Sequence, residues 1–373
     1  MQIKPLYIFL LLFLAISCLE PYYPEINDYI DLPVIEGTIT NEPGPYSVRL
    51  SRSTAILGME IKPISQAVVK IMDDAGNEET LRETVPGTYV TKAGGIQGVT
   101  GRSYKIVVTT RGKTYESDYE LLRTPVEIES ISHEISREPV KDGYIDGLQF
   151  YLNSGEISDP QTNLLWTVKE TYIFESEYKL DYIYWGPDSI QENHSDSGFI
   201  CWRTERLDKS FSWKATGPEM QLKKFPLHFV DVLTRRLSER YSVEVSQYTL
   251  SESAYIYWNE IEKLHEETGS LYTRQPYQVK GNLKNTGDTD EVVLGYFMAA
   301  GVAKKRIFVN RPSLIFNYNE CNPLINLLDV INPNEIKYPV FAMQAGADRA
   351  FAPLSCFDCR LKGGTETKPD FWE

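Results

Sequence analysis

The stretch LPVIEGTITNEPGPYSVRLSRS, residues 32–53, decides the fold class of this chain. Apolar and polar residues alternate on both sides of NEPGP at residues 41–45, which is typical of strands that bury one face. Because Asn, Pro and Gly favour turns, this cluster predicts a turn between the two runs. Two neighbouring strands joined by a turn are therefore expected, and the pattern indicates a β protein.

The same alternation continues to residue 124 without a convincing helix. Strand-like runs are separated by turn residues, with DAGN at 74–77 and RGK at 111–113 as the clearest hairpin turns. About seven short strands in a stretch of this size predict a β-sandwich of the immunoglobulin or transthyretin type. We therefore expect residues 32–124 to form an N-terminal β-sandwich domain.

Residues 125–373 are expected to form a larger, aromatic, β-rich C-terminal domain with one or two helices. LLWTVKETYIFESEYKLDYIYW at 164–185 alternates as a long strand does, and NTGD at 285–288 predicts the turn of a hairpin. The clearest helix is TLSESAYIYWNEIEKLHEET at 249–268, where Thr249 and Glu252 fit a capping box. The aromatic stripe of this helix is interpreted as its core face. The predicted fold class is therefore mainly β.

Residues 1–17 have the features of a signal peptide. The apolar run from Leu6 to Ile16 follows the positive charge of Lys4 and is shorter than the roughly 20 residues that a membrane-spanning helix needs. Small residues lead directly to Cys18, which resembles a bacterial lipobox. We expect Cys18 to be acylated, with chains such as palmitate, and residues 18–31 to form a lipidated tether to the membrane.

With Cys18 assigned to lipid, an even number of cysteines remains in an exported chain, which favours disulfides. Two bridges are expected, and the sequence leaves all three possible pairings open. An alternative interpretation takes the CFDC motif as half of a zinc site, but this needs two further soft ligands that the sequence does not provide nearby. The disulfide candidates are Cys201, Cys321, Cys356 and Cys359.

Composition excludes one class of partner and suggests another. The net charge is −14, with 38 Lys+Arg against 52 Asp+Glu, and no basic block occurs, so no nucleic-acid partner is expected. The 24 Tyr, 15 Phe and 6 Trp exceed what a core alone suggests and favour an exposed recognition surface for sugars or peptides. The candidates for such a surface are Tyr172, Tyr178, Tyr182, Tyr184 and Trp185.

The sequence shows no pattern of an established catalytic site. A nucleophile elbow, a Walker loop, H-E-x-x-H and a dinucleotide fingerprint are all missing from it, so no catalytic residue, metal or cofactor is predicted. Carboxylate pairs occur in turns and at the helix end, and we interpret them as solvated charges, with the loop GDTDE at 287–291 a weak calcium candidate. These pairs are Asp73-Asp74, Glu78-Glu79 and Glu266-Glu267.

Four blocks in chain order resemble a known family, the Bacteroidota lipoproteins grouped as domain of unknown function 4249. They are the opening stretch after the lipobox, VPGTYVTKAGG with GRSYKIVVTTRGKTYES, YSVEVSQYTLSESAYIYWNEI with EVVLGYFMAAG, and the terminal CFDCRLKGGTETKPDFW. The resemblance implies an outer-membrane lipoprotein, often encoded beside a TonB-dependent receptor, and no established enzyme activity. It offers no catalytic residues.

We therefore expect a non-enzymatic, lipid-anchored protein of the outer membrane, facing the cell surface rather than the periplasm. It is predicted to be an accessory subunit of a TonB-dependent transporter or a similar outer-membrane barrel, and to help in ligand capture or uptake. The lipid anchor confines the protein to the membrane plane and so raises its effective concentration at its partner. The alternative is a glycan- or peptide-binding surface lipoprotein that works alone, and a third reading, a cryptic hydrolase, requires two facing carboxylates in a cleft.

Overall fold

The computed structural model describes residues 31–53, 61–141, 143–207, 210–215, 221–267, 278–316, 321–325 and 336–372. The predicted signal peptide, Cys18 and the tether up to residue 30 lie outside these residues. Among the described residues, no helix is both long and apolar enough to cross a lipid bilayer.

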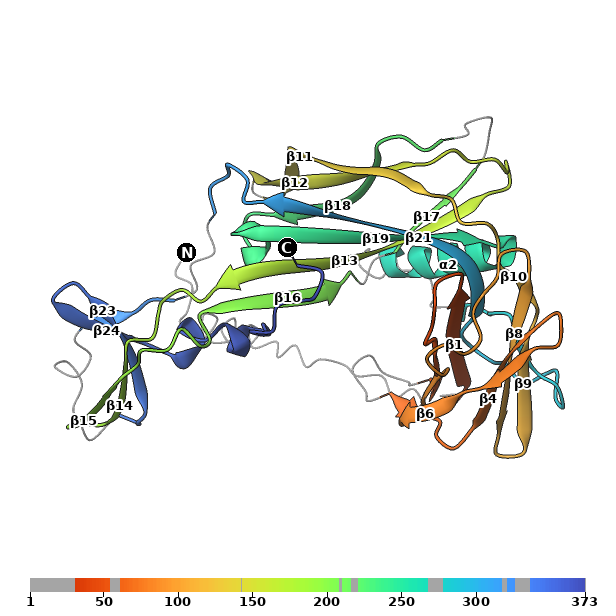
Figure 1. The fold of residues 1–373 in the computed structure, drawn as a ribbon, viewed down its shortest axis with the longest axis horizontal. Helices are drawn as coiled ribbons and strands as arrows, with labels where there is room; N and C mark the ends of the chain where they lie inside the picture. The colour runs from red at the N-terminus through yellow and green to blue at the C-terminus, as the bar shows by residue number, and fades with distance from the viewer. Residues whose placement is uncertain are drawn as a thin grey trace, which may run out of the picture.

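The protein is mainly β, as predicted, and the strands within the described residues form four sheets (Figure 1). The largest sheet runs through the middle of the molecule and continues into the N-terminal β-sandwich. Its strands, in spatial order, are β16 (Ile200–Arg206), β13 (Asn163–Glu175), β19 (Arg240–Leu250), β21 (Phe297–Asn310), β1 (Pro33–Thr40), β2 (Ser47–Arg52), β7 (Thr88–Val90) and β6 (Arg82–Val85), with β17 (Phe211–Lys214) beside β13 and β3 (Lys62–Pro63) beside β2.

The N-terminal sandwich packs the β1–β2 end of this sheet against a second sheet. Residues at alternate positions of both sheets point into one core, with Ile35 and Val48 on one side and Ile71 and Ile106 on the other. The predicted β-sandwich is therefore confirmed. The second sheet contains β20 (Leu283–Asn285), β9 (Lys113–Ser117), β8 (Ser103–Thr110), β4 (Val68–Asp73) and β5 (Glu78–Thr80), with β10 (Glu120–Leu121) beside β8.

The hairpin turns predicted at 74–77 and 111–113 are present. Strand β4 pairs with β5, and β8 pairs with β9. Arg111 and Gly112 have φ values of 48° and 77° at the second turn, as a type I′ hairpin turn requires. Glycine adopts this conformation without strain, which explains its place there.

Two later segments complete the sandwich. Strand β20 pairs antiparallel with β9, and the first residues of β21 pair in parallel with β1 from Gly37 to Thr40. The hairpin predicted around 285–288 is present only as one isolated antiparallel bridge between Lys280 and Leu294, because β20 pairs with β9 and not with the segment after the turn. Gly295, just before β21, has a φ of 92°, and a Cβ there would lie 2.1 Å from the carbonyl oxygen of Ile35. The boundary predicted at residue 124 stays a prediction.

A second core lies between the large sheet and a three-stranded sheet that covers one of its faces. Alternate residues of β13 point into it, and Trp166, Val168, Tyr172 and Phe174 are all buried as the alternation at 164–185 predicts. The covering strands are β11 (Ile128–Val140), β12 (Gly143–Ser154) and β18 (Phe225–Asp231), followed by the short helix η1 (Arg235–Leu237).

The predicted helix is α2 (Glu252–Glu267), and it packs on the opposite face of the large sheet. Its cap differs from the prediction. Thr249 belongs to strand β19, where its hydroxyl accepts from the amide of Val126, while the Ser251 hydroxyl accepts from the amide of Ala254. The cap therefore lies two residues later than predicted, because the strand continues to Leu250 before the helix can begin.

A smaller sheet projects from the end of the molecule opposite the sandwich (Figure 1). Two short helices, η3 (Leu354–Cys356) and η4 (Cys359–Lys362), connect it back to the large sheet. Its strands are β15 (Ser189–Glu192), β14 (Tyr182–Gly186), β23 (Val340–Ala345), β24 (Asp348–Ala352) and β22 (Leu324–Ile325).

Candidate functional site

The four remaining cysteines form two disulfides, as predicted. Cys201 on β16 pairs with Cys359 on η4, and Cys321 pairs with Cys356 on η3. The sequence left the pairing open, and the structure selects one of the three possibilities. Because all four sulfur atoms are bonded to each other in pairs, the zinc interpretation of the CFDC motif is wrong.

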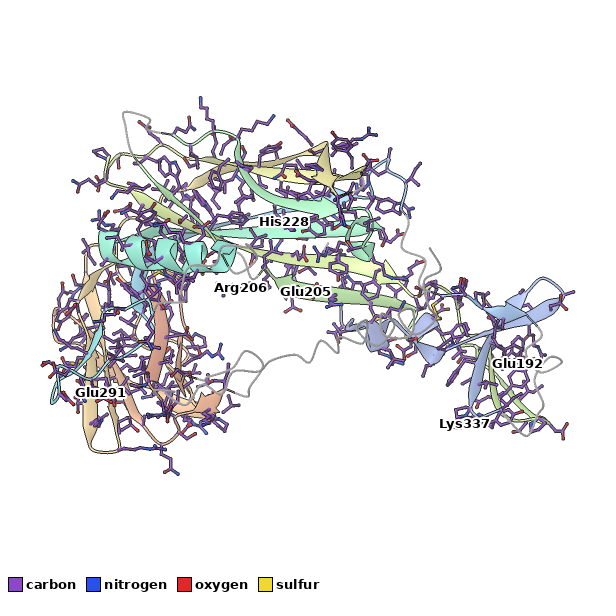
Figure 2. The ribbon with its side chains drawn as sticks, turned by 180° about the vertical axis from the view of Figure 1, so that it is seen from behind. Glu192, Glu205, Arg206, His228, Glu291 and Lys337 are labelled. Carbon is purple, nitrogen blue, oxygen red and sulfur yellow. A yellow bond between two sulfur atoms is a disulfide. The ribbon has the colours of Figure 1, made fainter. Side chains whose placement is uncertain are left out.

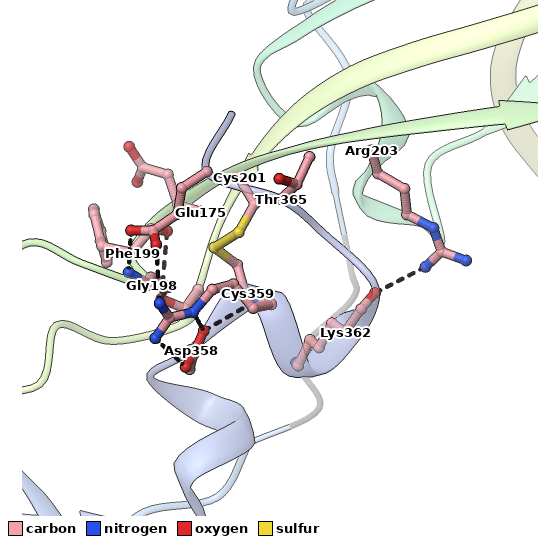
Figure 3. Close-up of a disulfide and its surroundings, with 12 residues drawn as sticks. Glu175, Gly198, Phe199, Cys201, Arg203, Asp358, Cys359, Lys362 and Thr365 are labelled. Atoms are coloured by element: carbon pink, nitrogen blue, oxygen red, sulfur yellow. Dashed lines mark hydrogen bonds and ion pairs between the residues drawn. A yellow bond between two sulfur atoms is a disulfide. The ribbon is translucent and has the colours of Figure 1, made fainter. Parts of the chain in front are cut away.

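The first bridge lies beside a small polar network within the C-terminal segment, and a hydrogen bond from Arg203 to the carbonyl oxygen of Lys362 also joins this segment to β16 (Figure 3). The Asp358 carboxylate accepts from the Arg360 guanidinium, and Arg360 also pairs with Glu366. Hydrogen bonding from Arg360 holds the pKa of Asp358 below its ordinary value, although burial opposes this. The charged side chains of Asp358, Arg360 and Glu366 are therefore paired with one another, which indicates a structural role for this region.

A cavity of about 540 Å³ opens on the face of the large sheet that carries α2, beside the N-terminal sandwich. Its volume lies within the range of roughly 300–1,000 Å³ that is typical of small-molecule sites. The large sheet, including its β1–β2 pair, forms the walls together with α2 and the segment that follows β16. The lining residues are Glu36, Gly37, Thr38, Ser47, Arg49, Leu165, Thr167, Arg206, Leu207, Ser210, Tyr248, Tyr257, Trp258, Tyr296 and Met298.

Aromatic side chains form the helix side and the base of this cavity. Tyr257 of α2 and Tyr296 are buried, with ring centroids 4.8 Å apart, while Trp258 and Tyr248 are half-buried. The indole N–H of Trp258 is buried and has no acceptor among the described residues. Burial, with a smaller contribution from the charge of Glu36, raises the pKa of Tyr257 to about 12, so its phenol stays protonated at neutral pH.

Three charged side chains line the same cavity without an ion-pair partner among the residues that the structure describes. Glu36 on β1 and Arg49 on β2 lie directly opposite each other in the strand register, and Arg206 comes from the end of β16. Figure 2 labels Arg206 on the large sheet. All three side chains belong to exposed residues. The cavity therefore has a local formal charge of about +1 in a strongly acidic protein.

The buried carboxylate of Glu120 positions Tyr296, which lines the cavity. Glu120 is 3% exposed and accepts hydrogen bonds from the hydroxyls of Tyr296 and Ser251, each at 2.5 Å, and of Ser253 at 3.0 Å. A fourth donor is the amide of Asn282, at 3.2 Å. Burial, followed by the charge of Glu120, strongly raises the pKa of Tyr296, so this phenol remains a donor. Glu120 thus joins the sandwich, the start of α2 and the Tyr296 ring.

We expect Glu120→Gln to lower the free energy of unfolding by about 2 kcal/mol, since the amide cannot accept from all four donors and leaves buried groups unpaired. Chemical denaturation of the full-length protein measures this change. Asp118→Asn is the matched control, because Asp118 pairs with Lys284 on the surface, where such a pair contributes little. Equal effects of the two substitutions would contradict the role given to Glu120.

Comparison with protein families shows the family to which the chain belongs. The model described as Domain of unknown function (DUF4249) matches residues 19–306. The chain belongs to the DUF4249 family. Every lining residue of the cavity lies within the matched segment, whereas Cys321, Cys356 and Cys359 lie beyond it. No match is found among curated proteins.

The sequence did not single out the cavity of this DUF4249 protein. The five aromatic candidates do not form one surface: Tyr172 is in the second core, Tyr184 is buried in the projecting sheet, and Trp185 is 56% exposed there. Tyr178 packs on Phe357. The expected core role of the aromatic helix stripe is confirmed for Ala254 and Tyr257. Tyr257 and Trp258 also line the cavity. Glu36 and Arg49 stand at polar positions of the alternating strands β1 and β2, so their pattern alone gave no signal of a cavity.

The carboxylate pairs stabilise turns where the structure describes them. Asp73 accepts from the backbone amides of Ala75 and Asn77, and Glu79 accepts from the amides of Lys92 and Ile96. Glu291 of the GDTDE loop pairs with Lys113. Within the described ranges, no group of three or more potential metal-binding side chains gathers around a common point. The side chains of Glu266 and Glu267 lie outside the described set.

Proposed function

We propose that this DUF4249 protein is a non-enzymatic, lipid-anchored protein of the outer membrane and an accessory subunit of a TonB-dependent transporter, which helps to capture a ligand. The placement at the membrane rests on the lipobox at Cys18, and the partner rests on the family resemblance. The observation that carries ligand capture is the cavity beneath α2, where aromatic rings and unpaired charges line one open site.

The chemistry of the cavity favours binding over hydrolysis. Glu36 is the single carboxylate among its lining residues, whereas glycoside hydrolysis ordinarily uses two carboxyl groups that face each other. The lining also offers no cysteine and no histidine. Aromatic side chains with a few fixed polar groups are instead typical of sites that orient and hold a ligand.

We expect Cys18→Ala to abolish labelling of the protein by a metabolic acyl probe, because the lipobox cysteine is the proposed attachment point. The same substitution should reduce recovery of a TonB-dependent receptor when the protein is purified after mild detergent extraction, since the anchor concentrates both partners in one membrane. Mass spectrometry of the purified material measures the partner. Equal acyl labelling of wild type and variant would exclude lipidation at Cys18.

The second candidate function is a glycan- or peptide-binding lipoprotein that works alone, and the same cavity favours it. Co-purification separates the two functions. Recovery of the wild-type protein without any barrel protein, under conditions that preserve a known transporter complex from the same membranes, would support independent action. Recovery together with a TonB-dependent receptor supports the accessory role.

A further inference from the structure

We infer that the cavity beneath α2 binds an acidic oligosaccharide, by pairing its carboxylate or sulfate groups with Arg49 and Arg206 and stacking its rings on aromatic side chains. This inference rests on the proposed ligand capture and adds the chemical class of the ligand. Figure 2 labels Arg206, one of the residues that line this cavity.

The two arginines favour an anionic ligand. Arg306, on the same large sheet, already pairs with Glu244, whereas the guanidinium groups of Arg49 and Arg206 have no acidic partner among the described residues. A guanidinium presents parallel N–H donors that match a carboxylate or a sulfate in geometry. Since one arginine comes from β2 and the other from β16, they line the cavity from two different elements and provide two separate points of contact.

The main chain of the lining strands favours a sugar over an extended peptide. Strand β1 lies between β21 and β2, β2 lies between β1 and β7, and β19 lies between β13 and β21. The backbone groups of these three strands are already paired in the sheet, so a bound peptide cannot add as a further strand to β1, β2 or β19. At these strands recognition comes from side chains, as it does for many small ligands.

The remaining lining groups match the surface of a sugar ring. Tyr248 and Trp258 are half-buried, so part of each ring can lie against the C–H groups of a pyranose, which the negative face of an aromatic ring attracts. Glu36 accepts hydrogen bonds from sugar hydroxyls, and the hydroxyls of Thr38 and Thr167 can donate or accept. A ligand that fits this lining carries anionic groups for the two arginines and sugar rings for the aromatic wall. An acidic oligosaccharide has both.

Calorimetric titration of the full-length, detergent-solubilised protein tests this inference with matched pairs of glycans. One pair is trigalacturonate and its fully methyl-esterified form, and the other is a sulfated heparin disaccharide and its desulfated form. We expect at least one acidic glycan to bind at least 10-fold more tightly than its neutral counterpart. This preference should decrease as salt is raised, because screening weakens interactions between exposed charges.

Three substitutions locate the site. Arg49→Gln and Arg206→Gln should each weaken binding of the acidic glycan about 10-fold, and Ser47→Trp, from an exposed position on β2, should block it by filling the cavity. Arg82→Gln on β6 is the control, because Arg82 is exposed and does not line the cavity. Circular dichroism of each variant establishes that it is folded.

The outcomes separate the ligand class from the proposed function. Equal affinity for acidic and neutral glycans, unchanged by Arg49→Gln and Arg206→Gln but lost in Ser47→Trp, overturns the acidic class and leaves ligand capture in place. Acidic binding that survives Ser47→Trp overturns the location, and no binding of either acidic glycan overturns the inference. Failure to recover a barrel protein in the co-purification instead counts against the accessory role alone.

Discussion

Replacing Cys201 and Cys359 together by alanine will lower the free energy of unfolding by about 5 kcal/mol, because this bridge joins residues separated by 158 positions. In the chain-entropy description, a disulfide restricts the unfolded chain more strongly when it closes a longer loop. Both cysteines are fully buried, so the double substitution avoids leaving one thiol unpaired in the core. Guanidinium unfolding of the exported full-length protein, followed by tryptophan fluorescence, measures the change.

The second bridge supplies the matched comparison. Cys321 and Cys356 are separated by 35 residues, so replacing this pair should cost about 4 kcal/mol in the same description. The first bridge should also have a local effect that the second lacks, because it fastens η4 to β16, and proteolysis should release the C-terminal segment more readily without it. A loss below about 1 kcal/mol for the Cys201–Cys359 pair would show that the hydrogen bonds of Arg203 and Trp202 on β16 with the C-terminal segment hold this end without the bridge.

Local patterns in the sequence predicted much of the fold because strand alternation and turn chemistry act over a few residues. The alternation at 164–185 identified the buried residues of β13, and the RGK turn identified the β8–β9 hairpin. The parallel pairing of Gly37 with Phe297 was not predictable in this way. This pairing joins residues far apart in the chain, and a local sequence pattern does not indicate which distant strand will pair with β1.

The cavity escaped prediction for the same reason. Its lining comes from strands at both ends of the matched segment and from α2, so its residues share no spacing in the sequence. Arg49 and Glu36 look like ordinary solvent-facing residues of an alternating hairpin, and they became site residues only when β21 and α2 were placed beside them. The number of disulfides was predictable from an even cysteine count, but their pairing depended on where η4 meets β16.

Glu170→Gln will lower the free energy of unfolding at neutral pH by about 3 kcal/mol, because it removes the one acidic group from a buried cluster of partners. Glu170 on β13 is 1% exposed and faces the second core. Its carboxylate lies 3.4 Å from Nε2 of His228 and 3.3 Å from Nε of Arg236, and it accepts from the Tyr241 hydroxyl at 2.7 Å. Figure 2 labels His228, which belongs to the strand β18 of the covering sheet.

The pH dependence of this effect has a definite sign. Burial raises the pKa of Glu170, but the nearby His228 imidazole, the hydrogen bond from Tyr241 and the charge of Arg236 outweigh it and hold that pKa below the ordinary 4.5. A carboxylate whose pKa is lower in the folded state than in the unfolded state stabilises the protein at pH values above its unfolded pKa. This contribution is lost as the pH falls through the folded pKa. Burial, followed by the charge of Glu170, raises the pKa of Tyr241 far above neutrality, so that phenol does not titrate in this range.

We therefore expect the difference in stability between wild type and Glu170→Gln to be largest near pH 7 and to shrink as the pH falls below about 4.5. Urea unfolding at a series of pH values measures it. Glu138→Gln is the control, since Glu138 is exposed on β11, where a single surface charge contributes little to stability. A difference between wild type and Glu170→Gln that stays constant into acid would mean that packing of the side chain, and not its charge, holds β18 and η1 against the large sheet.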